Sequence, residues 1–134
     1  MTAAQAETRK ERLTITTASG RYDFSVEVTN IEADKATGLM FRQSLGKRAG
    51  MLFPHAKPTE ITMWMKNTYI SLDMIFIRKD GCVHRIEKGT EPFSERIVAS
   101  QGNVSAVFEV AAGVADEIGL KAGDRVEHAF FAAH

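Results

Sequence analysis

Hydrophobic and polar residues alternate near the start of the chain, in the segment LTITTASGRYDFSVEV. Tyr22, Phe24, Val26 and Val28 fall on one face of an extended chain, and polar residues separate them. This period of two is typical of a strand that buries one face. With ASGR as the turn, the pattern predicts a β-hairpin over residues 13–28.

The next segment, TNIEADKATGLMFR, changes from alternation to a helical pattern. Thr29 with Glu32 three residues later matches a capping box, and acidic residues fall in the first turn, where the helix dipole favours them. We therefore expect a short helix over about residues 31–42. Gly38 inside it costs roughly 1 kcal/mol relative to alanine, which indicates close contact or a bend at that position.

The centre of the chain holds its most apolar run, MWMKNTYISLDMIFI, over residues 63–77. Before it, GMLFPH predicts a short strand that ends at Pro54, followed by a loop over residues 54–60. Alternation then predicts a strand over residues 61–66. The tetrapeptide KNTY interrupts the alternation, which resumes over residues 70–77 as a second strand.

An Asp-Gly pair at residues 80–81 lies between two apolar runs and is the strongest hairpin signal in the chain. If these two residues form the whole loop, Ile75 faces Ile86, and Asp73 faces Lys88 on the return strand. The register therefore predicts a cross-strand ion pair for Asp73, worth about 0.2–1 kcal/mol.

The last third of the chain predicts further strands and a second helix. Residues 89–103 read as an irregular excursion with a short edge strand at residues 97–99. VSAVFEV, residues 104–110, is apolar on nearly both faces and predicts a central strand. AAGVADEIGLKAGD predicts a helix of one or two turns that Gly119 ends, followed by a last strand over about residues 125–131.

Together these elements predict an α+β protein, mainly antiparallel, that forms a small closed or half-closed β-barrel-like domain with two short helices. The chain of 134 residues is long enough for one hydrophobic core. We expect a flexible N-terminal segment at residues 1–11 and a single globular domain over residues 12–134.

Composition narrows the function classes. The 17 basic residues balance the 17 acidic ones, so the chain lacks the electrostatic footprint of a nucleic-acid or membrane-surface protein. No stretch approaches transmembrane length. The single cysteine excludes an intramolecular disulfide, and the polar, alanine-rich start has no signal-peptide core. We favour the mature form of an exported, periplasmic protein over a cytoplasmic one, and the oligomeric state stays open.

Four polar residues interrupt the apolar run, namely Lys66, Asn67, Thr68 and Asp73. In one interpretation they are structural, with a turn that leaves the lysine solvated and Asp73 either paired with Lys88 or accepting backbone N–H bonds in the bend. In the other they form a small-ligand site beside an aromatic wall of Trp64 and Tyr69.

Metal and cysteine chemistry have weaker support. The internal methionines lie close together in the sequence, at positions 40, 51, 63, 65 and 74. With His55 or His84 they would suit Cu(I), but two of them alternate with Trp64 as core residues do. Cys82 near His84 has no activating context for a nucleophile. We therefore expect neither a metal nor a cofactor.

Six short motifs, GLMFR, GMLF, WMKNT, LD, FEV with Gly113, and GLKAGD, resemble domain-of-unknown-function family 192 in order and spacing, over about residues 12–130. The resemblance implies a compact, mostly β domain of bacteria and archaea, often made with an export signal and without an established activity. Ser71 replaces the proline usual in this pattern, so the bend before it is less rigid here. The positions that match are Gly38, Leu39, Met40, Arg42, Gly50, Met51, Phe53, Trp64, Met65, Lys66, Asn67, Thr68, Asp73, Glu109, Gly123 and Asp124.

Several of the matching residues are polar and embedded in apolar segments, and they suggest a site. Arg42 at the end of the first helix is expected to pair with Asp73 or Glu109 in a polar network at the barrel mouth. The first hypothesis is a non-catalytic domain that binds an unidentified small molecule, and no nucleic acid. Its expected ligand-binding residues are Arg42, Trp64, Lys66, Asn67, Thr68, Asp73 and Glu109.

Two alternatives remain open. One is a partner-interaction or structural domain, in which these groups only hold the fold together. The other is a small hydrolase or lyase with Asp73 or Glu109 as general base and Lys66 stabilising an anion. A carboxyl group with a raised pKa in an apolar cleft would support the enzyme.

Overall fold

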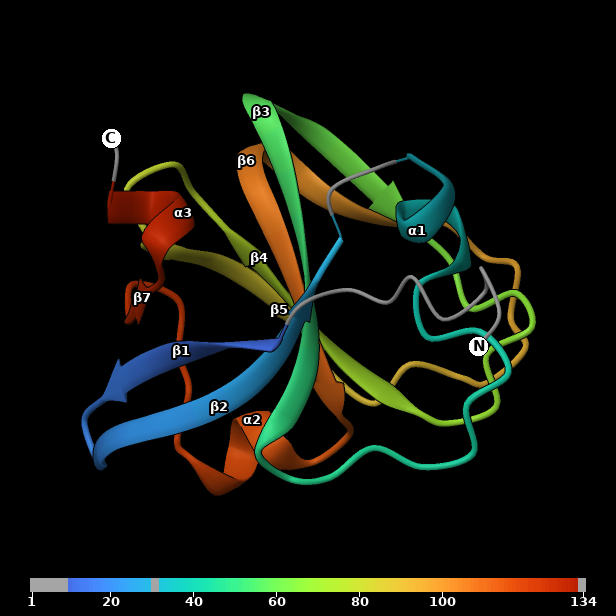
Figure 1. Ribbon diagram of the computed structural model, residues 1–134, viewed down its shortest axis with the longest axis horizontal. Coiled ribbons are helices and arrows are strands. Elements are labelled where there is room, and N and C mark those ends of the chain that lie inside the picture. The colour runs from blue at the N-terminus through green and yellow to red at the C-terminus, as the bar shows by residue number, and fades with distance from the viewer. Residues whose placement is uncertain (1–9, 30–31, 133–134) are drawn as a thin grey trace.

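A mixed sheet of seven strands curls into a half-barrel in this computed structural model, which describes residues 10–29 and 32–132 (Figure 1). The strands follow one another across the sheet in the order β5-β4-β6-β3-β2-β1-β7. Neighbouring strands are antiparallel except for the parallel pair β2 and β3. The predicted class, α+β with a half-closed barrel, is confirmed. The strands are β1 (Lys10–Thr17), β2 (Gly20–Val28), β3 (Ala49–Met63), β4 (Leu72–Ile77), β5 (Val83–Glu87), β6 (Val98–Ala111) and β7 (Arg125–Glu127).

The predicted first hairpin is confirmed as β1 and β2, in which Thr17 pairs with Gly20 across the turn. β1 begins earlier than expected, because Lys10 and Glu11 already pair with β2. The remainder of the expected flexible segment, residues 1–9, lies outside the described residues.

Three short helices lie among the described residues, one more than predicted: α1 (Glu32–Thr37), α2 (Val114–Glu117) and α3 (Ala129–Ala132). α1 is shorter than the expected helix over 31–42, because Gly38 takes a left-handed conformation with φ 49° and ends it. The expected capping box falls next to residues 30–31, which lie outside the described residues, and the hydroxyl of Thr29 donates to the carbonyl of Leu52 at 3.2 Å.

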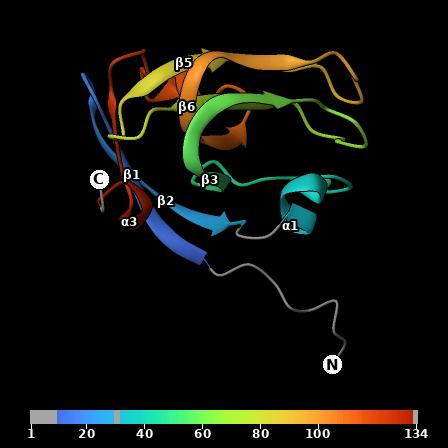
Figure 2. The same ribbon diagram turned by 90° about the horizontal axis from the view of Figure 1, so that it is seen from above.

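The C-terminal prediction is partly wrong. The expected last strand stops after three residues, and α3 follows it. Phe130 N–H donates to His128 Nδ1 at 3.0 Å, and the turn buries Phe131 to 5% exposure against the core. The longest strands of the sheet are β2, β3 and β6, and Figure 2 shows the sheet from above.

β3 corrects two predictions at once. The expected strand end at Pro54 and the loop over 54–60 are wrong, because β3 runs on through both. Its pairing with β6 shifts register between Pro54 and Thr59 and again between Glu60 and Thr62. Pro58 lies within the first irregular stretch, and Pro54 borders it. The predicted edge strand at 97–99 is likewise the start of β6, where Val98 pairs with Met63.

The hairpin of β4 and β5 has the predicted pairing of Ile75 with Ile86, but its loop is longer than two residues. A register shift after Phe76 brings Ile77 opposite Val83. The loop places Gly81 against β7, where Val126 N–H donates to the Gly81 carbonyl at 2.8 Å. This contact draws the two outer edges of the curled sheet together at one end.

The sheet buries apolar side chains on both faces. One cluster fills the inside of the curl and includes Phe108, Val110 and residues of α2 and α3. The second lies on the opposite face and includes Met51, Met74 and Val107. β6 pairs with β3 on one side and β4 on the other, which confirms its predicted central position.

Candidate functional site

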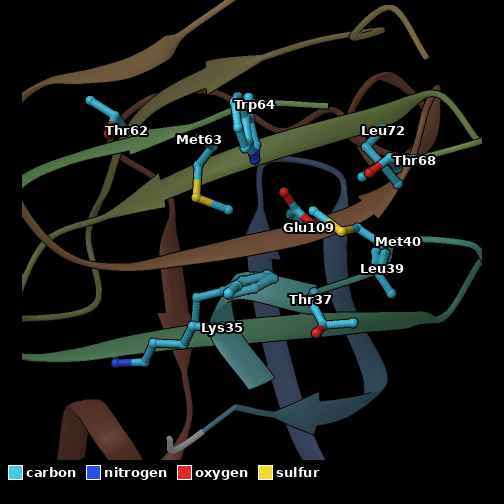
Figure 3. Close-up of a pocket in the computed structure, with 13 residues that line it drawn as sticks. Lys35, Thr37, Leu39, Met40, Thr62, Met63, Trp64, Thr68, Leu72 and Glu109 are labelled. Atoms are coloured by element: carbon cyan, nitrogen blue, oxygen red, sulfur yellow. The ribbon is translucent and has the colours of Figure 1, made fainter. Parts of the chain in front are cut away.

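A cavity of about 190 Å³ opens on the second face of the sheet, between α1 and the end of β3 (Figure 3). Leu39, Phe53 and Leu72 give it apolar walls. Trp64 stands at its rim with 41% of its surface exposed. The carboxyl group of Glu109 points into the space below Trp64 in this view.

Glu109 enters the cavity from the central strand β6. It lies opposite Met51 of β3 and Met74 of β4, so both flanking side chains are apolar and share its face. The residue is only 4% exposed, and none of the described residues donates a hydrogen bond to its carboxyl group. No fully enclosed side-chain oxygen of the described residues lacks a partner, so the Glu109 oxygens border the open space of the cavity. Burial raises the pKa of Glu109 from 4.5 to about 8.

Two other acids stand in the same cross-strand row, one at each side, and both are paired. Glu27 of β2 lies beyond Met51 and accepts two hydrogen bonds from Arg42, one at 2.7 Å. Glu87 of β5 accepts from Arg85 at 2.7 Å, and this bond lowers the pKa of Glu87 despite partial burial. Glu109 is therefore the member of the row without a cation from the described chain.

Arg42 does not join Asp73 or Glu109, so the predicted polar network at the barrel mouth is wrong. Its guanidinium group pairs with Glu27 instead, and the hydrogen bonds that it donates to the Glu27 carboxylate raise the pKa of Arg42. The two residues are separated by 15 positions and meet because β3 runs parallel to β2, which brings the connecting segment back across the sheet.

Asp73 lies on the opposite face of β4 from the cavity, because its neighbour Met74 shares the face of Glu109. Its carboxylate accepts three backbone N–H bonds, from Gly89 at 2.9 Å, Gly113 at 3.1 Å and Ala115 at 3.0 Å. The predicted backbone acceptor role is correct in kind, but the donors lie outside the KNTY bend. The predicted ion pair does not form.

Lys88, the expected partner of that ion pair, donates to Asp116 of α2 at 2.6 Å. Asp73 therefore fastens the loop after β5 and the start of α2 to the sheet. With three N–H groups bound to its two oxygens, it has the surroundings of a structural carboxylate.

The WMKNT motif forms the rim of the cavity and its support. Lys66 lies outside, exposed, with its ammonium group 5.2 Å from the centre of the Trp64 ring. Asn67 adopts φ 56°, and its carbonyl accepts the Phe41 N–H at 2.8 Å. Thr68 is buried at the cavity wall, where its hydroxyl donates to the carbonyl of Lys66 at 3.1 Å.

Of the seven expected ligand-binding residues, the structure brings Trp64, Thr68 and Glu109 together at the cavity. Arg42, Lys66, Asn67 and Asp73 do not line it. The apolar walls were missed as site residues, although the glycine inside the expected helix is a signal for them. A Cβ at Gly38 would lie 3.2 Å from the ring of Phe53, so this glycine lets the chain close over the cavity.

Three exposed aromatic rings lie next to the WMKNT motif, where the N–H of Phe41 donates to the carbonyl of Asn67 and that of Phe93 to the carbonyl of Thr68. The centres of Phe41 and Tyr69 are 6.4 Å apart, and those of Tyr69 and Phe93 are 5.1 Å apart. Phe41 and Phe93 both adopt φ 67°, a left-handed conformation that costs roughly 1–3 kcal/mol for a residue with a side chain. The surrounding loops therefore hold these rings at the surface against a local cost.

Three of the candidate copper ligands are core residues. Within residues 10–29 and 32–132, no group of three or more His, Cys, Asp and Glu side chains could hold a metal ion. Met51, Met65 and Met74 pack in the second apolar cluster, and His84 Nε2 is 2.9 Å from the carbonyl of Gln101.

No helix among the described residues is long and apolar enough to cross a membrane.

The chain is thus a small half-barrel domain with a buried acid at an apolar cavity. The model of the DUF192 family, described as Uncharacterized ACR, matches residues 14–128, and the chain belongs to this family. The resemblance seen in the sequence is thereby confirmed.

Two solved structures show the same fold. A proposed transcription regulator from Sinorhizobium meliloti 1021 is 38% identical, with a TM-score of 0.91 over 94% of this chain and 98% of that one. A protein of unknown function from Novosphingobium aromaticivorans DSM 12444 is 37% identical, with a TM-score of 0.87 over 96% and 98% of the two chains. No functionally curated protein matches the chain significantly.

Proposed function

We propose that this protein binds a small, mainly apolar ligand in the cavity between α1 and the end of β3. The observation that carries the proposal is Glu109, a residue only 4% exposed whose carboxyl group is directed into the cavity and receives no hydrogen bond from the described residues. A carboxyl group in such a poorly solvated space gains more from a polar partner than one at the open surface does. A ligand with one polar group would satisfy Glu109 and displace water from the walls.

The shape and composition of the cavity support the same function. Small-molecule sites are concave and mostly apolar, with a few polar groups that set the orientation of the ligand. Here Leu39, Phe53 and Leu72 supply apolar contact, Trp64 supplies a ring at the rim, and Glu109 supplies the polar anchor. The hydroxyl of Thr68 is a second polar group on the wall.

Fragment binding to the wild type and to Trp64→Ala tests this proposal. The matched control is Tyr69→Ala, because Tyr69 is exposed to a similar extent, 45% against 41%, and does not line the cavity. Fragments found by NMR chemical shifts should perturb residues around Glu109. Their Kd should rise about tenfold in Trp64→Ala, equivalent to ~1.4 kcal/mol, and stay unchanged in Tyr69→Ala. Equal losses in both variants, or no fragment at the cavity, would reject the site.

Acid–base catalysis at the same cavity is the second candidate. A pKa of about 8 lets Glu109 exchange a proton near neutral pH, as a general acid or base must. Asp73 is set aside as the base, since its oxygens hold three backbone N–H groups. Binding stands first because no second acid or base of the described residues is placed beside Glu109. Turnover of a bound fragment, abolished in Glu109→Gln while binding persists, would favour the enzyme.

A role in nucleic-acid binding has less support. The Sinorhizobium meliloti protein is described as a proposed transcription regulator, which concerns that protein. The present chain carries equal numbers of basic and acidic residues, 17 of each. A small-molecule ligand without nucleic acid therefore remains our proposal.

A further inference from the structure

We propose that the ligand of this cavity carries a cationic nitrogen, an ammonium or guanidinium group, that pairs with the carboxylate of Glu109. The inference rests on the proposed function and deepens it by naming the charge of the ligand. Its starting point is the row of acids across the sheet. Arg42 neutralises Glu27 and Arg85 neutralises Glu87, whereas Glu109 between them faces the cavity.

The groups around Glu109 favour a cation over an anion. The Trp64 ring already holds one ammonium group, that of Lys66, at 5.2 Å from its centre, so its faces suit positive charge. The thioethers of Met40 and Met63 and the hydroxyl oxygen of Thr68 are further electron-rich groups in the lining. An anionic ligand would instead meet a carboxyl group in a poorly solvated space, which is repulsive once that group ionises.

The charged groups on the neighbouring elements do not supply the missing partner. On α1, Lys35 is the one described basic side chain in the lining, and its ammonium end turns away from Glu109 (Figure 3). On β3, the stretch with His55, Lys57 and Glu60 lies beyond the cavity. On β4, Asp73 belongs to the other face and is bound to backbone N–H groups.

Binding of such a ligand is coupled to a proton. Without a ligand, burial keeps Glu109 protonated at neutral pH, since its pKa is about 8. A cation that enters the cavity favours the carboxylate, so the carboxyl proton leaves for the solvent and an ion pair with the ligand nitrogen forms. Below pH 8 the affinity for a cation should therefore rise with pH, by up to about tenfold per unit.

Three probes of one shape and different charge test the inference: benzylamine, benzyl alcohol and benzoate. Titrations of the wild type at pH 6 and pH 8, followed by NMR shifts of the cavity residues, give Kd for each probe. We expect benzylamine to bind tightest and to gain at least tenfold in affinity from pH 6 to pH 8. Benzyl alcohol should show no such gain, and benzoate should bind weakest.

Glu109→Gln keeps the shape of the side chain but cannot ionise, so it should lose both the preference for benzylamine and its pH dependence. Glu95→Gln is the control, because Glu95 is exposed and does not line the cavity. If benzyl alcohol or benzoate binds as well as benzylamine at both pH values, the cation is rejected and the binding function stands. If neither these probes nor a broad fragment set binds at the cavity, the binding function fails and the inference with it.

Discussion

At the scale of single residues, Glu109 and Asp73 show two opposite environments for a buried carboxyl group. Both are almost inaccessible, at 4% and 1% exposure. Asp73 receives three backbone N–H bonds, which join three segments of the chain. Glu109 receives none from the described residues, so it holds its proton. The first arrangement serves stability, and the second leaves a group available to a ligand.

The pH dependence of stability should report on Glu109. Its pKa is about 8 in the folded protein and about 4.5 when unfolded, so between these values the folded state holds a proton that the unfolded chain has released. Raising the pH through this window therefore favours unfolding. The free energy of unfolding should fall by up to about 1.4 kcal/mol per pH unit from about pH 4.5 to pH 8, and this contribution is constant outside the window.

Urea unfolding of the wild type and Glu109→Gln across pH 5 to 8 measures this contribution. The variant lacks the carboxyl group and should not show this loss. The free energy of unfolding of the variant minus that of the wild type should therefore increase as the pH rises. Glu95→Gln provides the control for losing an exposed acid. Parallel curves for wild type and Glu109→Gln would contradict the raised pKa.

Asp73→Asn should lower the stability strongly. The amide nitrogen that replaces one carboxylate oxygen cannot accept, so at least one buried N–H loses its partner, at a cost of about 2–3 kcal/mol. Lys66→Ala is the comparison within the same apolar run, and it should cost under ~1 kcal/mol because its contact with Trp64 is exposed. Chemical denaturation of both variants measures the two values. Equal costs would contradict the structural role assigned to Asp73.

At the scale of elements, local signals predicted those parts of the fold that depend on local chemistry. The first hairpin, the Ile75–Ile86 pairing, the central strand β6 and the helix ended by Gly119 all follow from alternation or a turn glycine. The length of β3 did not follow, because Pro54 is normally a strand end and only pairing with β6 carries the strand past it. α3 depends in the same way on tertiary burial of Phe131.

In the candidate site, too, local features could be predicted from the sequence and non-local contacts could not. An acid in the apolar VFEV segment marks Glu109 as unusual in the sequence alone. The partner of Arg42 could not be predicted, since it depends on the parallel pairing of β2 and β3, a non-local contact. The apolar walls come from segments far apart in sequence, which no local pattern connects.

Gly50 lies where β3 and β6 approach each other closely. A Cβ at this position would lie 2.5 Å from the Phe108 ring and 2.6 Å from the carbonyl of Glu109, so β3 and β6 would have to move apart. Gly50→Ala should therefore destabilise the protein by about 1–3 kcal/mol or more, as overpacking does. Gly46→Ala is the matched control, because its nearest neighbour would be 3.9 Å away. Thermal unfolding measures both, and a Gly50→Ala protein as stable as Gly46→Ala would contradict this close approach.

At the scale of the whole molecule, the curl of the sheet is closed by backbone bonds at one end. Val126 N–H donates to Gly81, Val83 N–H to Asp124, and Gly123 N–H to Val83, each at 2.8 Å. β7 is only three residues long, and these bonds add to its pairing with β1 in fixing the C-terminal part of the chain. We infer that this closure is less stable than the central strands.

Gly81→Ala tests the closure. With φ 90° and a Cβ that would lie 2.5 Å from the Val126 carbonyl oxygen, alanine here adds both backbone strain and a clash. Gly113→Ala is the control, since its φ of 96° gives similar strain with nothing within 4 Å. Hydrogen exchange should show lost protection at Val126 in Gly81→Ala, with β6 still protected. Equal protection of Val126 in both variants would contradict the closure.

The most direct test of the central claim is the titration of the Glu109 carboxyl carbon by NMR, in wild-type protein with and without benzylamine. The structure predicts an inflection near pH 8 for the free protein. Saturating benzylamine should shift it downward, because the bound cation stabilises the carboxylate. An inflection near 4.5 in the free protein would contradict the claim that Glu109 is a buried, unpaired acid held ready for a ligand.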